Sequence, residues 1–299
     1  MLSSDWRREL ARTEADPALL DAERVRERIE VLDRLEAELG CADLHGLEFD
    51  GLDASIVERA RALRNKLEAA NAELYRSLRT EIRNGAGFDA LRRRIHALLG
   101  WEDGQLAAPG LSYDYRDELL SGVLGIREPI EVELGLERGH ASAEMVFYQP
   151  TPARHILDLI AASGLCEDDV LLDLGSGLGH VPMLASMVSG ARSVGIEIEP
   201  GYAACSRECA EGLGLKRVTF IQQDAREADV SEGTVFFLYT PFSGSILSTV
   251  LSKLRKESLK RRIRICTFGP CTTVVAKVPW LVADGVADAE RVTVFQASY

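Results

Sequence analysis

The segment at residues 171–180, LLDLGSGLGH, strongly constrains the fold of this 299-residue chain. A short apolar run contains the acidic residue Asp173, and glycines then occupy the alternate positions 175, 177 and 179. Glycine permits tight turns with positive φ and lets a ligand approach the main chain closely. A plain strand-to-helix turn needs neither the acid nor three glycines. The pattern therefore predicts a buried strand that ends in a ligand-binding turn and opens a helix.

Strands and helices are expected to alternate through the second half of the chain. Short apolar or β-branched runs, expected as strands, lie at residues 170–174, 193–197, 218–222, 235–239, 263–268 and 291–297, with one more apolar segment at 272–278. Helical patterns lie between several of these runs, at residues 180–189, 201–213 and 243–258. This alternation predicts an α/β fold: a doubly wound, Rossmann-like parallel sheet with helices on both faces.

The sequence before the sheet has a different pattern. Apolar residues recur at steps of three and four over residues 21–39 and 53–83, and a third helix is expected at 88–99. We therefore expect an all-helical N-terminal domain at residues 1–110. An acidic junction or lid, with a short helix near 113–124, would follow at 111–149. The sheet domain would occupy 150–299, opening with a helix at about 153–162 after two prolines.

Two ligand classes compete for the glycine turn. A dinucleotide site requires G-x-G-x-x-G, but here the third glycine comes one residue early and His180 occupies the expected position. The carboxylate of Asp173 would also repel a pyrophosphate, whereas it would attract an ammonium group. A cofactor with an amino-acid end, a nucleoside end and no phosphate fits this chemistry better. The turn therefore favours S-adenosylmethionine and disfavours a nicotinamide oxidoreductase.

The ends of the later strands carry suitable chemistry in the same order. The second strand ends at Glu197, which can accept hydrogen bonds from two ribose hydroxyls. The third is followed by Asp224, which can accept a hydrogen bond from an adenine amino group. The fourth ends in residues 239–242, Tyr-Thr-Pro-Phe, where a transferable methyl group should point. Ligands bind at the carboxyl ends of the strands in such sheets, so these side chains are expected to form one site.

The motifs DLGSGLGH, GIEIEP, QQDAR and YTPF resemble the successive motifs of class I, seven-strand S-adenosylmethionine-dependent methyltransferases. The resemblance covers about residues 150–299 and implies that residues 291–297 form an antiparallel seventh strand. It also implies that Asp173, Gly175 and Gly177 hold the methionine end of the cofactor, Glu197 the ribose and Asp224 the adenine. The full set of residues expected at the cofactor is Asp173, Gly175, Ser176, Gly177, Gly179, Glu197, Asp224, Ala225, Gln149 and Thr151.

A narrower resemblance joins VFYQPTPARHILDLI, residues 146–160, to the glycine motif. This pairing is similar to the non-SET histone-lysine methyltransferases, which also have a helical N-terminal region and a loop that closes over the cofactor. The chain departs from that family, because Gln149, Pro150 and Thr151 replace its Tyr-Gly-Glu loop motif and YTPF replaces its asparagine-containing motif. Histone specificity is therefore not carried over. YTPF matches the Asp/Asn-Pro-Pro-Tyr of amino-group methyltransferases in position only.

The expected acceptor site lies at the end of the fourth strand. Its predicted substrate-contacting residues are Tyr239, Thr240, Pro241 and Phe242. Tyr239 and Tyr148 are the predicted catalytic residues, with Tyr148 also closing the cofactor pocket, although Tyr239 fits a core position equally well. His180 at the start of a helix is interpreted as a cap or core residue, and Glu144 as a solvated acid.

Charge bears on the acceptor. Of the net charge of −12, the segment at residues 111–169 contributes −8, from 4 Lys and Arg against 12 Asp and Glu. This segment leads into the expected substrate mouth, and a negative field favours a cationic acceptor. We therefore expect an amine, either a protein lysine or a small basic metabolite. An O-methyltransferase of a small metabolite, and a cofactor-binding protein that only recruits partners, remain alternatives.

Composition excludes several other classes. The acidic balance disfavours a nucleic-acid partner. No apolar run is long enough for a membrane span, and the N-terminal residues lack an apolar signal core, so a cytoplasmic protein is expected. The six cysteines are too sparse for a disulfide framework and lack C-x₂-C spacing, so no metal site is expected. The helical region is a candidate dimer surface.

Overall fold

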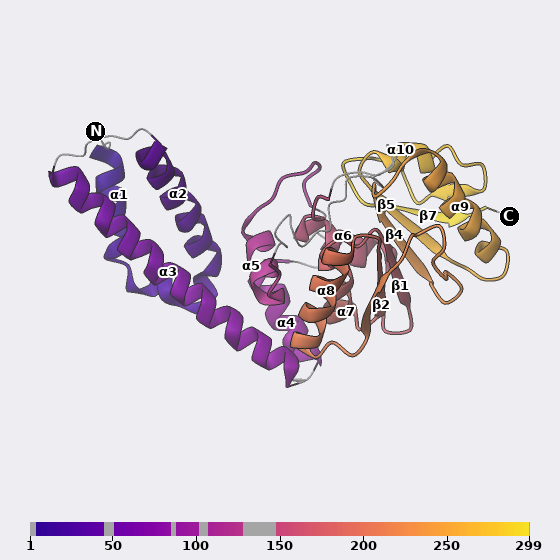
Figure 1. Ribbon diagram of the computed structural model, residues 1–299, viewed down its shortest axis with the longest axis horizontal. Helices are drawn as coiled ribbons and strands as arrows, with labels where there is room; N and C mark the ends of the chain where they lie inside the picture. Colours follow the sequence, from indigo (N-terminus) through magenta and orange to yellow (C-terminus); the bar gives the residue numbers. More distant parts are fainter. Residues whose placement is uncertain (1–3, 45–50, 85–87, 102–106, 128–147, 299) are drawn as a thin grey trace. The chain divides into compact units, whose positions relative to one another are not determined.

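The computed structural model describes residues 4–44, 51–84, 88–101, 107–127 and 148–298 (Figure 1). The chain forms two compact units. The helical unit comprises residues 1–80 and 114–123, and the sheet unit comprises residues 81–113 and 124–299. A helical N-terminal region and a sheet are thus both present, as expected. The boundaries placed at residues 110 and 149 from the sequence stay predictions.

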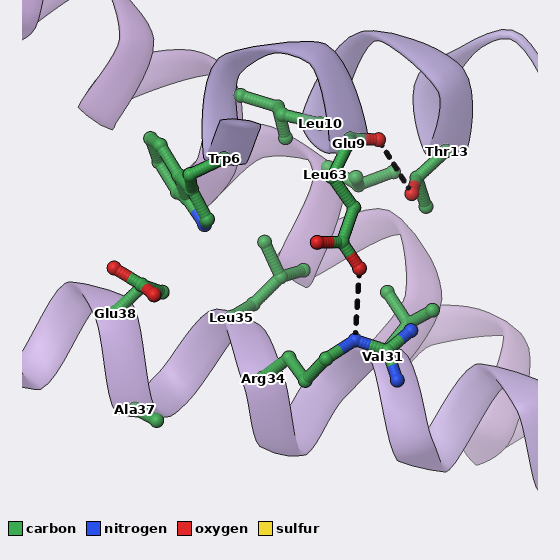
Figure 2. A pocket seen from close by; sticks show the side chains of 10 residues that line it. All are labelled: Trp6, Glu9, Leu10, Thr13, Val31, Arg34, Leu35, Ala37, Glu38 and Leu63. Atoms are coloured by element: carbon green, nitrogen blue, oxygen red, sulfur yellow. Dashed lines mark hydrogen bonds and ion pairs between the residues drawn. The ribbon is translucent and has the colours of Figure 1, made fainter. Parts of the chain in front are cut away.

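The helical unit is built from amphipathic helices whose apolar faces meet. Its elements are α1 (Ser4–Glu14), the short 3₁₀ turns η1 (Pro17–Leu20) and η2 (Ala22–Arg24), α2 (Val25–Leu44), α3 (Gly51–Arg83) and α5 (Tyr115–Leu124), of which α3 and α5 extend by their last residues into the sheet unit. Trp6 and Leu10 of α1 pack with Leu35 of α2 and Leu63 of α3 in one buried cluster. The three helices leave a cavity of about 130 Å³ lined by these four side chains, with an ion pair from Arg34 Nε to Glu9 Oε1 of 3.1 Å beside it (Figure 2).

A buried arginine fixes the 3₁₀ turns to the long helices. Arg28 is 0% exposed, and its Nε donates to Asn71 Oδ1 of α3 at 2.6 Å. Its Nη1 donates to the carbonyl oxygens of Leu19 and Asp21, both at 2.8 Å. Burial lowers the pKa of this guanidinium. Hydrogen bonds of this kind offset part of the cost of burying its charge.

The sheet unit contains a seven-stranded sheet in the order β3-β2-β1-β4-β5-β7-β6. Its strands are β1 (Val170–Leu174), β2 (Arg192–Glu197), β3 (Val218–Gln222), β4 (Val235–Tyr239), β5 (Arg264–Phe268), β6 (Leu281–Ala283) and β7 (Thr293–Ala297). The first five are parallel, and β7 is antiparallel to both β5 and β6. The predicted Rossmann-like sheet with an antiparallel last strand is confirmed.

Helices cover both faces of this sheet (Figure 1). The unit contains α4 (Phe88–Leu98), α6 (Ala153–Ser163), α7 (His180–Ser189), α8 (Pro200–Leu213), α9 (Gly244–Ser258) and α10 (Cys271–Val275). Along β1, Leu172 and Leu174 point into a core shared with α9 and α10. Successive side chains of a strand point to opposite faces, so Asp173 points to the other side, where α7 lies against β1 and β2.

The sequence located most of these elements. The bounds of β1, β3 and β4 agree with the prediction, and those of β2 and β5 differ by one residue. The three-residue strand β6 was missed, and the apolar segment at 272–278 mostly forms the short helix α10. A strand of three residues is too short for alternation to mark it.

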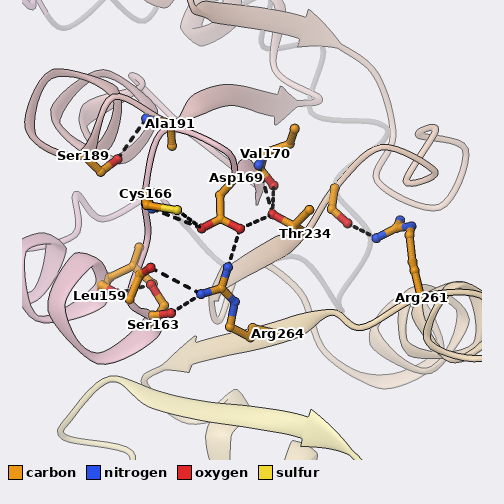
Figure 3. Close-up of polar contacts among 12 residues, drawn as sticks. Leu159, Ser163, Cys166, Asp169, Val170, Ser189, Ala191, Thr234, Arg261 and Arg264 are labelled. Atoms are coloured by element: carbon orange, nitrogen blue, oxygen red, sulfur yellow. Dashed lines mark hydrogen bonds and ion pairs between the residues drawn. The ribbon is translucent and has the colours of Figure 1, made fainter.

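A polar network holds the amino end of β1 (Figure 3). Asp169 accepts hydrogen bonds from Thr234 Oγ1 at 2.7 Å and from the main-chain nitrogen of Cys166 at 3.1 Å, and it forms an ion pair with Arg264. The same guanidinium donates to the carbonyl oxygen of Ser163. The network therefore joins α6, β1 and β5 at the amino ends of the strands, whereas the glycine turn lies at the carboxyl end of β1.

The helices of the described residues are not membrane spans: none combines enough length with enough apolar character to cross a bilayer.

Candidate active site

The glycine turn after β1 has the backbone that its sequence requires. Gly175, Gly177 and Gly179 have φ angles of +95°, +51° and +82°, which disfavour residues with a side chain. A Cβ atom at Gly175 would collide with Pro241, and one at Gly177 would collide with the ring of Tyr148. The turn therefore needs glycine both for its conformation and for the close approach of its neighbours.

The second strand holds this turn in place. The main-chain nitrogens of Gly175 and Ser176 both donate to the carbonyl oxygen of Ile196, at 2.8 and 3.0 Å. The main-chain nitrogen of Gly177 donates to Glu197 Oε2 at 2.7 Å. The hydroxyl of Ser176 is buried and lacks a partner among the described residues. The turn thus presents one buried hydroxyl that a ligand could satisfy.

Asp173 and Glu197 are buried acids at this end of β1 and β2. Burial, and after it the charge of Glu197, raises the pKa of Asp173 well above its usual range. Burial also raises the pKa of Glu197, although the main-chain nitrogens of Glu199 and Gly177 donate hydrogen bonds to its carboxylate. No described residue donates a hydrogen bond to the Asp173 carboxylate. A buried carboxylate without donors fits an ammonium group that brings both positive charge and N–H donors.

Asp224 and Ala225 follow β3. Both oxygens of the Asp224 carboxylate accept from the Arg226 guanidinium, and the Oδ2 to Nη2 distance is 2.6 Å. These hydrogen bonds lower the pKa of Asp224. Ala225 is buried in the core that contains α9. A role for Asp224 toward adenine stays a prediction, and it would require the carboxylate to share or leave Arg226.

Tyr148 lies over the glycine turn. Its ring packs against Gly177, and its centroid is 4.9 Å from that of Tyr202 in α8. Its hydroxyl oxygen is 3.5 Å from His180 Nδ1. Burial lowers the pKa of His180 to about 4, so this imidazole is neutral near pH 7. The structure thus brings Tyr148 to the predicted cofactor pocket, and its closing role there stays a prediction.

The residues that follow Tyr148 differ in exposure. Gln149 is exposed, whereas Thr151, two residues before α6, is buried. Their contacts with the cofactor stay predictions. Glu144, the acid considered from the sequence, lies outside the described residues.

Tyr239 ends β4, and its ring centroid is 4.9 Å from that of Phe268 at the end of β5. Its hydroxyl is buried and lacks a hydrogen-bond partner among the described residues. Burial, with a smaller effect from Tyr113, raises the pKa of this phenol. Tyr239 is therefore a neutral phenol near pH 7, able to donate or accept a hydrogen bond but unsuited to act as a phenolate base.

The residues after Tyr239 are held tightly. Thr240 has a φ of +40°, rare for a β-branched residue and typical of strained functional turns. Its Oγ1 donates to the carbonyl oxygen of Phe268 and accepts from the main-chain nitrogen of Cys271, both at 3.1 Å. Phe242 is 6% exposed and belongs to the core. Thr240 thus fixes the turn, and the predicted acceptor contacts of Thr240, Pro241 and Phe242 stay predictions.

Sequence reasoning did not single out Tyr113, which contacts the loop that follows Tyr148. It precedes α5 without a recognisable motif, yet its hydroxyl donates to the carbonyl oxygen of Pro150 at 2.8 Å. Only contacts between segments distant in sequence reveal this placement.

Comparisons with known proteins find methyltransferases that are similar to this chain. A family model described as "Histone methylation protein DOT1" matches residues 138–278. A protein-lysine N-methyltransferase of Saccharolobus islandicus (strain REY15A) is 25% identical over 131 residues, which cover 43% of this chain and 74% of that protein.

Two solved structures illustrate the structural neighbours. An RNA methyltransferase from Salinibacter ruber in complex with S-adenosyl-L-homocysteine is 32% identical, with a TM-score of 0.39, and the match covers 50% of this chain and 92% of that one. A methyltransferase from Geobacter sulfurreducens, described as SAM-dependent and also in complex with S-adenosyl-L-homocysteine, is 25% identical, with a TM-score of 0.34. That match covers 40% of this chain and 50% of that one.

Proposed function

We propose that this chain, a class I S-adenosylmethionine-dependent methyltransferase, transfers the methyl group of its cofactor to an amine, with protein lysine as the leading acceptor class. The cofactor supplies an electrophilic methyl group on a sulfonium. The observation that supports the amine is the net charge of −12, because a negative field attracts a cationic acceptor. The lysine methyltransferase relative supports the same acceptor class.

The site residues divide by chemistry. Asp173 would bind the ammonium of the methionine end, and the glycine turn would lie against that end of the cofactor. Glu197 would accept hydrogen bonds from the ribose hydroxyls, and Asp224 one from the adenine amino group. Each of these contacts is proposed from the position of its residue at the carboxyl end of a strand.

Methyl transfer is an in-line displacement, so the protein mainly positions and desolvates the reacting groups. An amine must lose its proton before it can attack. Neither Tyr239 nor His180 is suited to remove this proton near pH 7. Burial keeps the Tyr239 phenol protonated and lowers the pKa of His180 to about 4. We infer that the amine reaches the methyl group already in its neutral form.

RNA is a second candidate acceptor, because the Salinibacter ruber relative is an RNA methyltransferase. The net charge of −12 disfavours it, since binding to a phosphate backbone relies on positive charge. A metabolite hydroxyl and a role in partner recruitment without turnover would give different results in the assay below.

The test starts with calorimetry and ends with labelled transfer. The wild type should bind S-adenosylmethionine and S-adenosylhomocysteine but not NAD, and Asp173→Ala should bind neither. Methyl transfer from labelled S-adenosylmethionine is then compared for polylysine, acetylated polylysine, a mixed RNA and a panel of small alcohols. Transfer to polylysine alone supports the proposal. Transfer that is faster to RNA or to an alcohol, or cofactor binding without any transfer, contradicts it.

A further inference from the structure

The segment at residues 107–113 belongs to the sheet unit and is fixed to it at Gly110. The main-chain nitrogen of Gly110 donates to the carbonyl oxygen of Glu290 at 3.1 Å. Its carbonyl oxygen accepts from Arg154 Nη2 at 2.6 Å and from His155 Nε2 at 2.8 Å, and both donors lie in the first turn of α6. A glycine with a φ of +95° lets the chain turn between these partners.

A second set of hydrogen bonds fixes the beginning of the same segment. The main-chain nitrogen of Ala107 donates to Asp158 Oδ1 at 3.0 Å, and its carbonyl oxygen accepts from Arg291 Nη1 at 3.0 Å. Asp158 is 4% exposed and also lies 3.2 Å from His155 Nδ1. The segment is therefore held at two points by buried or half-buried polar groups, unlike an ordinary surface loop.

The anchor at Gly110 and the end of β4 share one aromatic scaffold. His155, whose Nε2 lies at Gly110, stacks on Phe268 with ring centroids 4.3 Å apart. Phe268 in turn packs on Tyr239, with centroids 4.9 Å apart. His155 and Phe268 are both fully buried. This rigid path fixes the position of the segment with respect to Tyr239.

Tyr113 is the aromatic residue that this segment carries toward the site. Its hydroxyl donates to the carbonyl oxygen of Pro150, in the loop between Tyr148 and Thr151, and 43% of the residue is exposed. Gly110, three residues before Tyr113, is joined to Tyr239 through His155 and Phe268, so the segment brings Tyr113 toward the end of β4. Tyr239 meanwhile keeps a buried hydroxyl without a partner among the described residues.

We propose that Tyr113 forms the outer aromatic wall of the acceptor site and, with Tyr239 at its inner end, positions a primary amine for methylation. The inference rests on the proposed function and assigns a positioning residue outside residues 138–278, where the family model matches. The ring of Tyr113 attracts the ammonium form on entry by a cation–π interaction. The Tyr239 oxygen then accepts an N–H hydrogen bond and gains the partner that it lacks.

The chemistry balances without a further reactant. The ammonium that enters first releases one proton to solvent. The neutral nitrogen then forms a bond to the methyl carbon, the carbon–sulfur bond breaks, its electron pair stays on sulfur, and the product leaves as a methylated ammonium. Tyr113 and Tyr239 take no part in these bond changes, so both act through the position of the nitrogen.

The test measures binding of n-butylammonium, a minimal lysine side chain, to the protein loaded with S-adenosylhomocysteine. By calorimetry, Tyr113→Ala should weaken n-butylammonium about tenfold, as expected for loss of a partly desolvated cation–π contact. Tyr113→Phe keeps the ring and should retain most of the affinity. Leu111→Ala is the matched control, because Leu111 lies in the same segment and is similarly exposed, at 46%. It should bind as the wild type does.

The two hypotheses fail in different ways. Unchanged n-butylammonium binding in Tyr113→Ala overturns the role of Tyr113, even if lysine is methylated normally. An equal loss of n-butanol binding overturns it too, because the contact would then not recognise charge. So does a parallel loss of S-adenosylhomocysteine affinity, which would show a general disturbance of the pocket. Binding of n-butylammonium that depends on Tyr113, without methyl transfer to any amine, supports the aromatic wall and contradicts the proposed function.

Discussion

Asp173 and Glu197 form a pair of buried acids on neighbouring parallel strands, and the charge of Glu197 adds to burial in raising the pKa of Asp173. Burying two like charges lowers the stability of the protein without its ligand. Binding of a cationic ligand removes this destabilisation. The pair therefore links the stability of the protein to cofactor binding, and the two effects can be measured separately.

Asp173→Asn should stabilise the cofactor-free protein at pH 7 while abolishing cofactor binding. The folded-state pKa is raised, so the stabilising effect of the protonated carboxyl is complete below the unfolded-state pKa, near 4, and is lost as pH rises through the folded-state value. An amide has no charge, so the substitution removes the cost of burying an ionised carboxylate at pH 7. A gain of about 1 kcal/mol in unfolding free energy would raise the melting temperature by about 2–4 °C. Thermal melts at pH 4 and 7, together with calorimetry, measure both effects.

Asp168→Asn is the control for this variant, because it makes the same change at an exposed neighbouring residue. It should alter neither the melting temperature nor cofactor affinity. A cofactor-free Asp173→Asn protein that melts below the wild type at pH 7 would show that the carboxylate is stabilised within the fold.

Gly177→Ala should lose cofactor binding and stability together. The residue has a φ of +51°, and its new methyl group would collide with the Tyr148 ring. Strain and displacement of Tyr148 should cost about 1–3 kcal/mol of unfolding free energy. Chemical denaturation and calorimetry give the two quantities.

Gly212→Ala in α8 is the matched substitution. Its Cβ would have no atom within 4 Å, and its φ is not in the left-handed region. It should stabilise the protein by about 0.5–1 kcal/mol, through reduced freedom of the unfolded chain and better helix propensity, and leave affinity unchanged. Equal affinities of Gly177→Ala and Gly212→Ala for S-adenosylhomocysteine would refute a close approach of the cofactor to the turn.

Sequence patterns predicted the parts of this molecule that depend on local chemistry. The glycine turn, the acid that ends β2 and the acid that follows β3 were each predicted from a strand and the residue types at its end, so β1 and its turn were located correctly. The alternation of strands and helices predicted the parallel sheet, and the antiparallel β7 came from the family resemblance. Strand β6 was missed because three residues carry no periodic pattern.

Positions that depend on contacts between distant segments could not be predicted in this way. Tyr113 reaches Pro150 and Gly110 reaches His155 through hydrogen bonds across 37 and 45 residues of sequence. Neither segment has a composition that indicates its partner. The inward hydrogen bonds of Thr240 are likewise set by the neighbouring strand β5, whereas the sequence indicated only that this residue follows β4.

Asp169→Asn should reduce stability without affecting cofactor affinity. Its network lies at the amino end of β1, whereas the glycine turn lies at the carboxyl end. Burial alone would raise the pKa of Asp169, but hydrogen bonds from Thr234 and Arg264 outweigh that effect and lower it. Removing the charge leaves Arg264 without its ion-pair partner, so we expect a loss of about 1–3 kcal/mol in unfolding free energy.

The pH dependence gives a second readout of the same network. Because the folded-state pKa is lowered, the contribution of Asp169 is present above the unfolded-state pKa, near 4, and is lost as pH falls through the folded-state value. The difference between wild type and Asp169→Asn should therefore shrink from pH 6 to pH 3 in urea denaturation. A difference that stays constant over this range would show that packing, and not charge, accounts for the effect.

The rate of methyl transfer to lysine should rise about tenfold per pH unit between pH 6 and 9. A lysine amine with an ordinary pKa near 10.4 is almost wholly protonated in this range, so its neutral fraction sets the rate if no residue removes the proton. His180, with a pKa of about 4, and the protonated Tyr239 offer no titration in this interval. His180→Gln and Tyr239→Phe should lower kcat/KM, the latter about tenfold through lost positioning, while the slope against pH stays the same. Initial rates at saturating S-adenosylmethionine test this, and a plateau above pH 7 in the wild type that is lost in one variant would identify that residue as the base.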